Sequence, residues 1–293
     1  MSAPSSSSAA PPPARSPHKL VRPGEPTLHY FVQAPESEAK GAVLVVHGYA
    51  EHGGRYHELS DALVGRGYRV AVVDLRGHGL SEGVRGHAEH FADYLRDLDD
   101  LLETLAKDAS WASAGKPALL GHSFGGLICF HYGLANPARA RGTLLSSPFF
   151  GIKLAVPVVK RAAAQVLSRL VPTFGLPSGL SGRDVSHDPA MIKAYDEDPL
   201  NGRKATARWY TEVVAAHAAA LDKAPQFHGP ITIFAAGADR VVSVEATQAV
   251  FARVGSGKKA LRVLEGQFHE IFNEIEREAT IREAIDAVDA FFG

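Results

Sequence analysis

The chain has almost no cysteine and no excess of charge of either sign. Its one cysteine, Cys129, cannot form a disulfide within the chain, which excludes a small secreted domain stapled by disulfides. The 31 basic residues are balanced by 32 acidic residues, so the formal net charge is -1. Nucleic-acid-binding proteins usually carry an excess of basic residues, which this chain lacks. We therefore expect no nucleic-acid partner.

Long apolar runs are also missing. No stretch approaches the roughly 18 consecutive apolar residues of a membrane-spanning helix, so the sequence predicts none. Hydrophobic residues still make up 45% of the 293 residues, which is enough for the core of one large domain. The location we expect is the cytoplasm, with peripheral attachment to a membrane as an open alternative.

The N-terminal segment, residues 1–17, has few residues that a folded core uses. It reads MSAPSSSSAAPPPARSP and lacks the apolar stretch of a secretory signal. Serine, alanine and proline in this proportion cannot bury enough surface to fold. We therefore expect a disordered tail over residues 1–17.

From residue 18 onward, strand-like and helix-like runs alternate. Near-continuous apolar runs of strand length occupy residues 29–35, 41–48, 68–74, 117–123, 141–148, 230–237 and 260–266. Helical patterns occupy residues 55–66, 91–107, 125–135, 244–254 and 278–292. This alternation predicts the α/β class, with a mostly parallel, doubly wound sheet that helices cover on both faces.

The alternation of strand-like and helix-like runs is interrupted over residues 149–228. This segment contains no clear strand but many helix formers and several prolines. We predict a helical cap there, inserted before the last two strands and dividing the core into residues 18–148 and 229–293. Within it, residues 152–174 place apolar side chains at helical spacing. The main role expected for this apolar face is packing on the core, and transient contact with a membrane surface is a second hypothesis.

The segment GHSFG, residues 121–125, lies where an apolar strand gives way to a helical run. This is the G-x-S-x-G pattern, in which the serine occupies a sharp strand-to-helix turn with a strained backbone. Gly121 and Gly125 are small enough to let strand and helix approach each other. The pattern predicts that the Ser123 hydroxyl is lifted above the sheet as a nucleophile.

A serine hydroxyl needs a base to take its proton, and the base needs an acid to orient it. In this kind of sheet the acid and then the histidine follow the serine, each at the end of a strand. Asp239 ends the run ITIFAAGAD, and His269 ends LRVLEGQFH. The order and the positions predict a catalytic triad of Ser123, Asp239 and His269.

Other candidate residues fit less well. Asp74 also ends a strand but precedes the serine, so we expect it to organise the loop that follows it by hydrogen bonds. His47, His52 and His57 lack the spacing of a metal site, and GSGKK at residues 255–259 does not complete a phosphate-binding loop. We predict neither a metal nor a cofactor.

When a serine nucleophile attacks a carbonyl group, the triad also needs donors for the oxyanion of the tetrahedral intermediate. The strand-like run before His47 leads through HGY, which places the backbone N–H of Tyr49 at a strand end. Together with the N–H of Phe124, which follows the nucleophile, it provides two preorganised donors. We predict an oxyanion hole formed by Tyr49 and Phe124.

Seven segments together resemble the monoacylglycerol lipase and lysophospholipase group of the α/β-hydrolases. They are HGYAEHGGRY, DLRGHGLSEG, GHSFGG, SSPFF, AYDEDPL, GADRVVS and FHEIFNE, and they extend over most of the chain. The resemblance implies the α/β-hydrolase fold, with Ser123 as nucleophile, His269 as base and Asp239 as orienting acid. It also implies that Glu51 and Arg55 line the polar end of the site, where a glycerol head group lies, and that Tyr195 reaches in from the cap.

The function we expect is hydrolysis of a monoacylglycerol to glycerol and fatty acid through an acyl-enzyme intermediate. A lysophospholipase or a general carboxylesterase remains an alternative with the same chemistry. A non-catalytic ligand-binding protein on the same fold is the alternative from another class. The sequence indicates neither the acyl chain length nor the oligomeric state.

Overall fold

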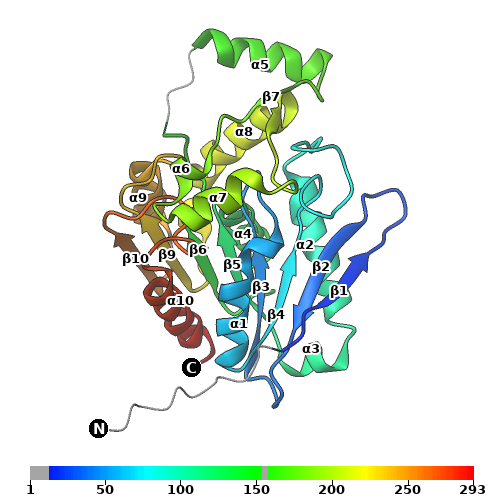
Figure 1. The fold of residues 1–293 in the computed structure, drawn as a ribbon, viewed down its shortest axis with the longest axis vertical. Coiled ribbons are helices and arrows are strands. Elements are labelled where there is room, and N and C mark those ends of the chain that lie inside the picture. Colours follow the sequence, from blue (N-terminus) through cyan, green and yellow to red (C-terminus); the bar gives the residue numbers. More distant parts are fainter. Residues whose placement is uncertain (1–12, 154–157) are drawn as a thin grey trace.

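The computed structural model of the chain describes residues 13–153 and 158–293 (Figure 1). Its central sheet has eight strands in the order β1-β2-β4-β3-β5-β6-β9-β10. The strands are β1 (Ser16–Leu20), β2 (Leu28–Gln33), β3 (Gly41–Val46), β4 (Tyr68–Val73), β5 (Ala118–His122), β6 (Thr143–Ser146), β9 (Ile231–Ala236) and β10 (Lys259–Leu264). The first two pairings, β1 with β2 and β2 with β4, are antiparallel, and the remaining pairings are parallel.

Helices cover both faces of this sheet, as the alternating pattern predicts. They are α1 (His57–Gly65), α2 (Ala92–Leu105), α3 (Ala109–Ser113), α4 (Phe124–Ala135), α9 (Val244–Arg253) and α10 (Arg277–Phe292), with the short 3-10 helices η1 (Gly53–Tyr56) and η2 (Ala224–Gln226). Side chains of β3 alternate between two apolar clusters, because successive strand residues point to opposite faces. Leu44 packs with residues of α2 and α4, and Val45 packs with residues of α1 and α10. The expectation of an α/β-hydrolase fold with a mostly parallel sheet is confirmed.

Strand β1 lies partly inside the segment for which we expected disorder. That expectation was wrong for Ser16 and Pro17, which pair with β2. Tertiary contacts order this stretch: the side-chain amide of Gln33 donates to the carbonyl of Pro13 at 2.8 Å, and Arg15 forms an ion pair with Asp61. The rest of the expected tail, residues 1–12, lies outside the described residues.

The segment between β6 and β9 holds the helices of the predicted cap. They are α5 (Val158–Leu170), α6 (Gly182–Val185), α7 (Pro189–Glu197) and α8 (Ala207–Lys223). Two strands of three residues, β7 (Gly175–Pro177) and β8 (Lys204–Thr206), pair antiparallel there, although the sequence predicted no strand in this range. In Figure 1 these elements lie above the upper end of the sheet, with α5 farthest from it.

Helix α5 packs on α8 but leaves apolar side chains in solvent. Ser168 is buried, and its hydroxyl lies 2.8 Å from that of Thr211 on α8. The side chains of Val166 and Leu170 are 56% and 74% exposed, so the expectation that the apolar face mainly packs on the core was wrong for them. The cause is geometric, because α8 covers only one side of α5. The earlier apolar residues Val158 and Val159 lie outside the described side chains.

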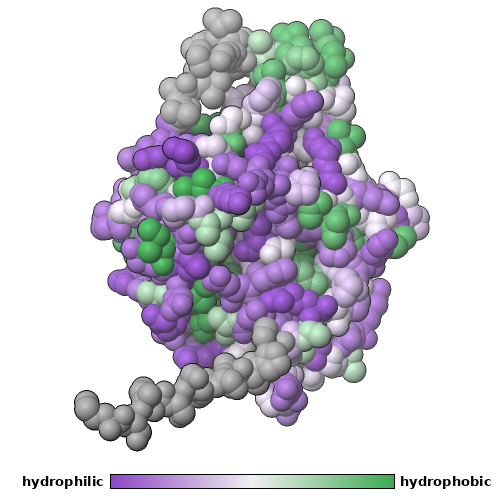
Figure 2. All heavy atoms as spheres, viewed as in Figure 1, coloured by the Kyte–Doolittle hydropathy of each residue, from purple (hydrophilic) through white to green (hydrophobic). Residues whose placement is uncertain are grey.

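Further exposed apolar side chains continue this surface beyond the helix. We call the whole group the cap patch; it consists of Val166, Leu170, Val171, Phe174 and Leu176. Figure 2 shows hydrophobic residues gathered at the top of the molecule, in the region of α5 and β7 in Figure 1. Among the described residues, no helix has both the length and the apolar character needed to cross a membrane.

Candidate active site

Ser123 occupies the turn between β5 and α4, and its backbone is in a conformation that non-glycine residues rarely adopt. Its φ is 52° and its ψ is -115°. The flanking glycines are required by close approach. A Cβ on Gly121 would lie 2.5 Å from the carbonyl oxygen of Gly125, and a Cβ on Gly125 would lie 2.2 Å from that of Val46. Both distances are too short for any side chain, so the turn depends on the two glycines.

The three residues expected to form the triad lie in one hydrogen-bonded line. The Nε2 atom of His269 is 2.8 Å from the Oγ atom of Ser123, and its Nδ1 atom is 2.7 Å from the Oδ2 atom of Asp239. A carboxylate only accepts hydrogen bonds, so Nδ1 carries the proton and Nε2 is free to accept one from the serine. The exposed fractions of Ser123, Asp239 and His269 are 6%, 0% and 4%. The arrangement is therefore that of a nucleophile, a base and an orienting acid in a site nearly closed to water.

Asp239 is fixed by its own backbone neighbours as well as by the histidine. Its Oδ1 atom accepts from the N–H groups of Val241 and Val242 at 2.7 and 2.9 Å. Burial is the largest single influence on His269 and opposes its charge, but the carboxylate of Asp239, helped by those of Glu270 and Glu51, outweighs burial in sum, so the pKa of His269 is raised above its usual value. The site thus stabilises the imidazolium that forms when the base takes a proton.

The two expected oxyanion donors come from the start of α4 and from the loop that follows β3. Phe124 is the first residue of α4, so its N–H has no carbonyl four residues back within the helix. Tyr49 follows Gly48 at the end of β3, and a Cβ on Gly48 would lie 3.0 Å from the Cβ of Ser123. The Tyr49 side chain holds this loop to the cap: its hydroxyl donates to the carbonyl of Lys204, and its ring lies 3.9 Å from that of Trp209.

A buried polar cluster adjoins this loop. The Oε1 atom of Glu51 accepts from the N–H of Gly48 at 2.5 Å and from the Tyr56 hydroxyl at 2.7 Å. Arg55 lies between two carboxylates: its Nε atom is 3.4 Å from Glu51, and its Nη2 atom forms an ion pair with Glu270. Burial first, and the charge of Glu270 second, raise the pKa of Glu51 to about 7.

Tyr195 joins the same cluster from helix α7 of the cap. Its ring centroid is 5.0 Å from the guanidinium carbon of Arg55, and its side chain is fully buried. The structure therefore brings together Glu51, Arg55 and Tyr195, the three residues expected at the polar end.

Sequence reasoning missed two acidic residues close to the base, Glu270 and Glu274. Both side chains are buried, and Glu270 carries the ion pair with Arg55. The signal was present in FHEIFNE, where two acidic residues follow His269 within five positions. Nothing in their spacing tells a buried acid from a solvated one, which is why neither was chosen.

The residues set aside in the sequence have structural contacts. The carboxylate of Asp74 accepts from the N–H of Leu80 at 2.8 Å, so its expected role in the loop is confirmed. The Nε2 atom of His47 accepts from the N–H of Leu75 at 2.9 Å, and that of His52 lies 2.9 Å from a carboxylate oxygen of Asp198. His47 therefore holds the loop after β4, and His52 contacts the cap.

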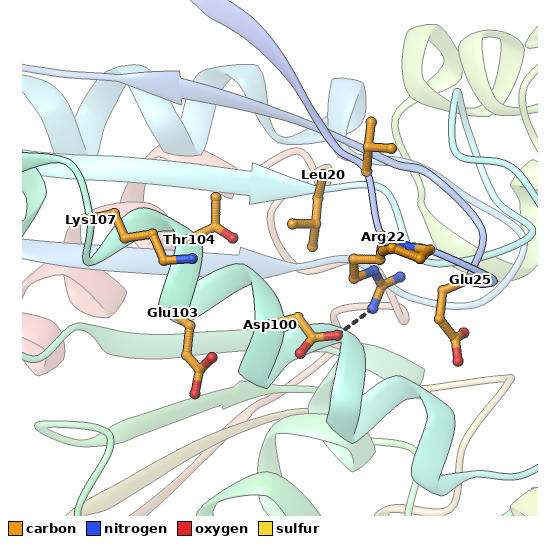
Figure 3. Close-up of a pocket in the computed structure, with 9 residues that line it drawn as sticks. Leu20, Arg22, Glu25, Asp100, Glu103, Thr104 and Lys107 are labelled. Atoms are coloured by element: carbon orange, nitrogen blue, oxygen red, sulfur yellow. Dashed lines mark hydrogen bonds and ion pairs between the residues drawn. The ribbon is translucent and has the colours of Figure 1, made fainter.

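A surface hollow of about 400 Å³ lies elsewhere, between the segment after β1 and helix α2 (Figure 3). Among its charged residues, Arg22 is 2.8 Å from a carboxylate oxygen of Asp100, and it is also 2.6 Å from a carboxylate oxygen of Asp97 nearby. The hollow is at the β1 edge of the sheet, whereas the triad is at the ends of β5, β9 and β10. It is therefore separate from the candidate active site.

Comparison with known proteins shows which families and structures this chain is similar to. Residues 37–276 match the model of the family described as serine aminopeptidase, S33. A monoacylglycerol lipase of Mycolicibacterium smegmatis is 32% identical over 269 residues, covering 91% of this chain and 94% of the relative. Phospholipase YtpA of Bacillus subtilis is also 32% identical, over 257 residues, covering 85% of this chain and 95% of the relative. The crystal structure of a Paleococcus ferrophilus monoacylglycerol lipase aligns with a TM-score of 0.81 and 29% identity, over 89% of this chain and 99% of that one.

Proposed function

We propose that this chain, which belongs to the α/β-hydrolase family described as serine aminopeptidase, S33, hydrolyses monoacylglycerols to glycerol and a fatty acid. The observation that carries the proposal is the line of hydrogen bonds from Ser123 through His269 to Asp239. The similarity to monoacylglycerol lipases over nearly the whole chain supports the choice of substrate.

The first half of the proposed reaction forms an acyl-enzyme. Nε2 of His269 accepts the hydroxyl proton of Ser123 while Oγ attacks the ester carbonyl. The N–H groups of Tyr49 and Phe124 bind the oxyanion, and each such donor contributes about 3 kcal/mol to transition-state stabilisation. The imidazolium then gives its proton to the glycerol oxygen, the carbon–oxygen bond breaks, and glycerol leaves.

The second half repeats these roles with water. His269 takes a proton from a water molecule, which attacks the acyl carbonyl while the same two N–H groups bind the oxyanion. Collapse of the intermediate releases the fatty acid and returns the proton to Ser123. Asp239 keeps the imidazole in one tautomer throughout, which its fixed contacts with the 241–242 backbone favour.

The polar cluster of Glu51, Arg55 and Tyr195 is the proposed site for the alcohol part of the substrate. It offers carboxylate acceptors, a guanidinium and a phenol in a buried setting, which together suit the hydroxyl groups of a small neutral polyol. Glu270 and the partly ionised Glu51 offset the charge of the single guanidinium, so the cluster has no net positive charge to attract an anionic head group.

Lysophospholipid hydrolysis is the second candidate, because a relative of equal identity is named a phospholipase. Purified protein should be given monooleoylglycerol, lysophosphatidylcholine and a short-chain nitrophenyl ester, with release of fatty acid or nitrophenol as the readout. We expect turnover of the monoacylglycerol to exceed that of the lysophospholipid. The reverse order would favour the second candidate, and turnover of the short ester alone would leave only a carboxylesterase.

The nucleophile is tested by Ser123→Ala, with Ser113→Ala as the matched control. Ser113 is an exposed serine at the end of α3, which precedes β5, whereas Ser123 follows that strand, so the two serines lie toward opposite ends of β5. Loss of a triad nucleophile lowers kcat by about 10⁶-fold, whereas the control should keep wild-type activity. Labelling with a fluorophosphonate probe should disappear in Ser123→Ala only. No labelling of the wild type would support the non-catalytic binding protein instead.

The proposal includes a location in the cytoplasm at a membrane surface, with the cap patch as the contact. An apolar patch at one end of the molecule is suited to a lipid interface. Leu170→Glu should weaken co-sedimentation with phosphatidylcholine vesicles. Val21→Glu, at an exposed apolar residue just after β1, should not. Equal binding by both variants would rule out this contact, and cell fractionation tests the location.

A further inference from the structure

The two residues next to His269 in the chain, Phe268 and Glu270, both donate backbone hydrogen bonds. The N–H of Phe268 donates to the Oε1 atom of Glu274 at 2.8 Å. The N–H of Glu270 donates to the carbonyl of Val185, in the cap, also at 2.8 Å. The backbone of the base is therefore fixed on each side, and one of the two attachments belongs to the cap.

Glu274 is the centre of these contacts. It is fully buried and accepts from four N–H groups. Oε1 accepts from the N–H of Phe268 and from Nδ1 of His187, each at 2.8 Å. Oε2 accepts from the N–H groups of His187 and Ile275 at 3.2 and 3.1 Å. Because the four partners are donors, the site requires two acceptor oxygens and is matched to a carboxylate.

The ring of Phe268, next to the base, packs against two residues from different parts of the chain. The ring of His187, from the cap, has its centroid 3.5 Å away at an interplanar angle of 31°. The guanidinium carbon of Arg240, which follows the triad acid, is 3.9 Å from the Phe268 ring centroid. Arg240 also donates to the carbonyl of Arg183 in the cap at 3.2 Å. The cap thus contacts the neighbours of both the base and the acid.

One more hydrogen bond joins the same two segments: the hydroxyl of Ser186 donates to the carbonyl of Asn273 at 2.8 Å. Residues 183–188 of the cap and residues 268–274 of the histidine loop therefore form a continuous interface built around one buried carboxylate. We name this interface the histidine clamp.

We propose that Glu274 is a positioning residue for His269, and that residues 183–188 of the cap complete the clamp that holds the base at hydrogen-bond distance from Ser123. The inference rests on the serine chemistry proposed above. Catalysis depends steeply on such placement, since a shift of about 1 Å in a catalytic group costs roughly 100-fold in rate. The cap therefore acts on the chemical step as well as on substrate binding.

The test is Glu274→Gln, which keeps the size of the side chain but turns an N–H₂ group toward N–H donors. We expect kcat for a short-chain nitrophenyl ester to fall about 10- to 100-fold with little change in KM, because the base moves while the substrate contacts stay. The rate of fluorophosphonate labelling should fall by a similar factor. Glu278→Gln, at an exposed glutamate one turn further on, is the control and should match the wild type.

His187→Phe distinguishes an effect on the histidine clamp from a general loss of core stability. It keeps a ring against Phe268 but removes the Nδ1 donor, and the His187 side chain is 42% exposed, so the core stays intact. We expect a smaller loss of kcat, about 3- to 10-fold, again without a change in KM. His187→Asn, which retains a side-chain N–H donor, should recover part of it.

The outcomes divide clearly. If folded Glu274→Gln and His187→Phe are labelled at the wild-type rate, the clamp does not position the base and the inference is wrong, even where thermal stability drops. If Glu274→Gln fails to fold, the two His187 variants decide alone. If the wild type itself is not labelled, the proposed function fails, and the inference fails with it for that separate reason.

Discussion

A single methyl group at Gly125 should disable the site without touching any catalytic side chain. A Cβ there would lie 2.2 Å from the carbonyl oxygen of Val46 and 2.4 Å from that of His47. Both contacts are with backbone atoms, which cannot rotate away as a side chain can. In Gly125→Ala the start of α4 must therefore move away from the end of β3.

The size of the effect follows from those distances. Restoring ordinary contact requires a separation of roughly 1 Å between α4 and β3, and overpacking of this kind costs about 1–3 kcal/mol of stability. The same movement pulls the N–H of Phe124, on α4, away from the N–H of Tyr49, which follows β3. Losing one oxyanion donor lowers kcat by about 10²- to 10³-fold. Activity should therefore fall more than stability.

Thermal unfolding and nitrophenyl ester turnover measure the two quantities on the same sample. Gly65→Ala is the matched control, since Gly65 ends α1, no heavy atom lies within 4 Å of its added Cβ, and the change favours the helix by up to about 1 kcal/mol. We expect Gly65→Ala to keep full activity with equal or higher Tm. If Gly125→Ala retained kcat within about threefold of wild type, the argument that close packing of α4 on β3 sets the oxyanion donors would be refuted.

Three other predictions concern charge and burial. Asp239→Asn removes the carboxylate that raises the pKa of His269; kcat should fall about 10⁴-fold, and the acid limb of its pH profile should move to lower pH, because His269 must be neutral to act as base. Burial and Glu270 raise the pKa of Glu51 to about 7, so its neutral form is favoured on folding. The wild type should lose stability relative to Glu51→Gln as the pH rises from 4.5 to about 7, measured by urea unfolding. Burial raises the pKa of the Cys129 thiol, so a disulfide reagent should label it only once urea unfolds the chain; rapid labelling of the native protein would contradict its burial.

The sheet and the triad could be predicted because local patterns and one topological rule determine them. Apolar runs of strand length predicted β2 to β6, β9 and β10, and all of these strands except the edge strand β10 are mostly buried. In a parallel sheet the carboxyl ends of the strands share one edge, so Ser123, Asp239 and His269 had to converge. At this shared edge, His269 lies within hydrogen-bond distance of both partners, 2.7 Å from Asp239 and 2.8 Å from Ser123.

The features that could not be predicted from the sequence depend on contacts between residues far apart in the chain. Strand β1 is mostly exposed, so it carries no apolar run, and its order comes from pairing with β2. The outward direction of Val166 and Leu170 depends on which side of α5 the helix α8 covers. Glu274 and His187 are 87 residues apart, and no period in the sequence links them.

The position of the cap insertion explains why the cap reaches the base at all. The chain leaves the sheet after β6 and returns at β9, and these two strands lie side by side between β5, which carries the nucleophile, and β10, which leads to the histidine. An insertion at that point necessarily rises over the edge where the triad converges. Its residues 183–188 then meet the histidine loop, as the bond from Glu270 to Val185 shows. Substitutions in this part of the cap should therefore change kcat, whereas substitutions in the outlying cap patch should change only access to lipid.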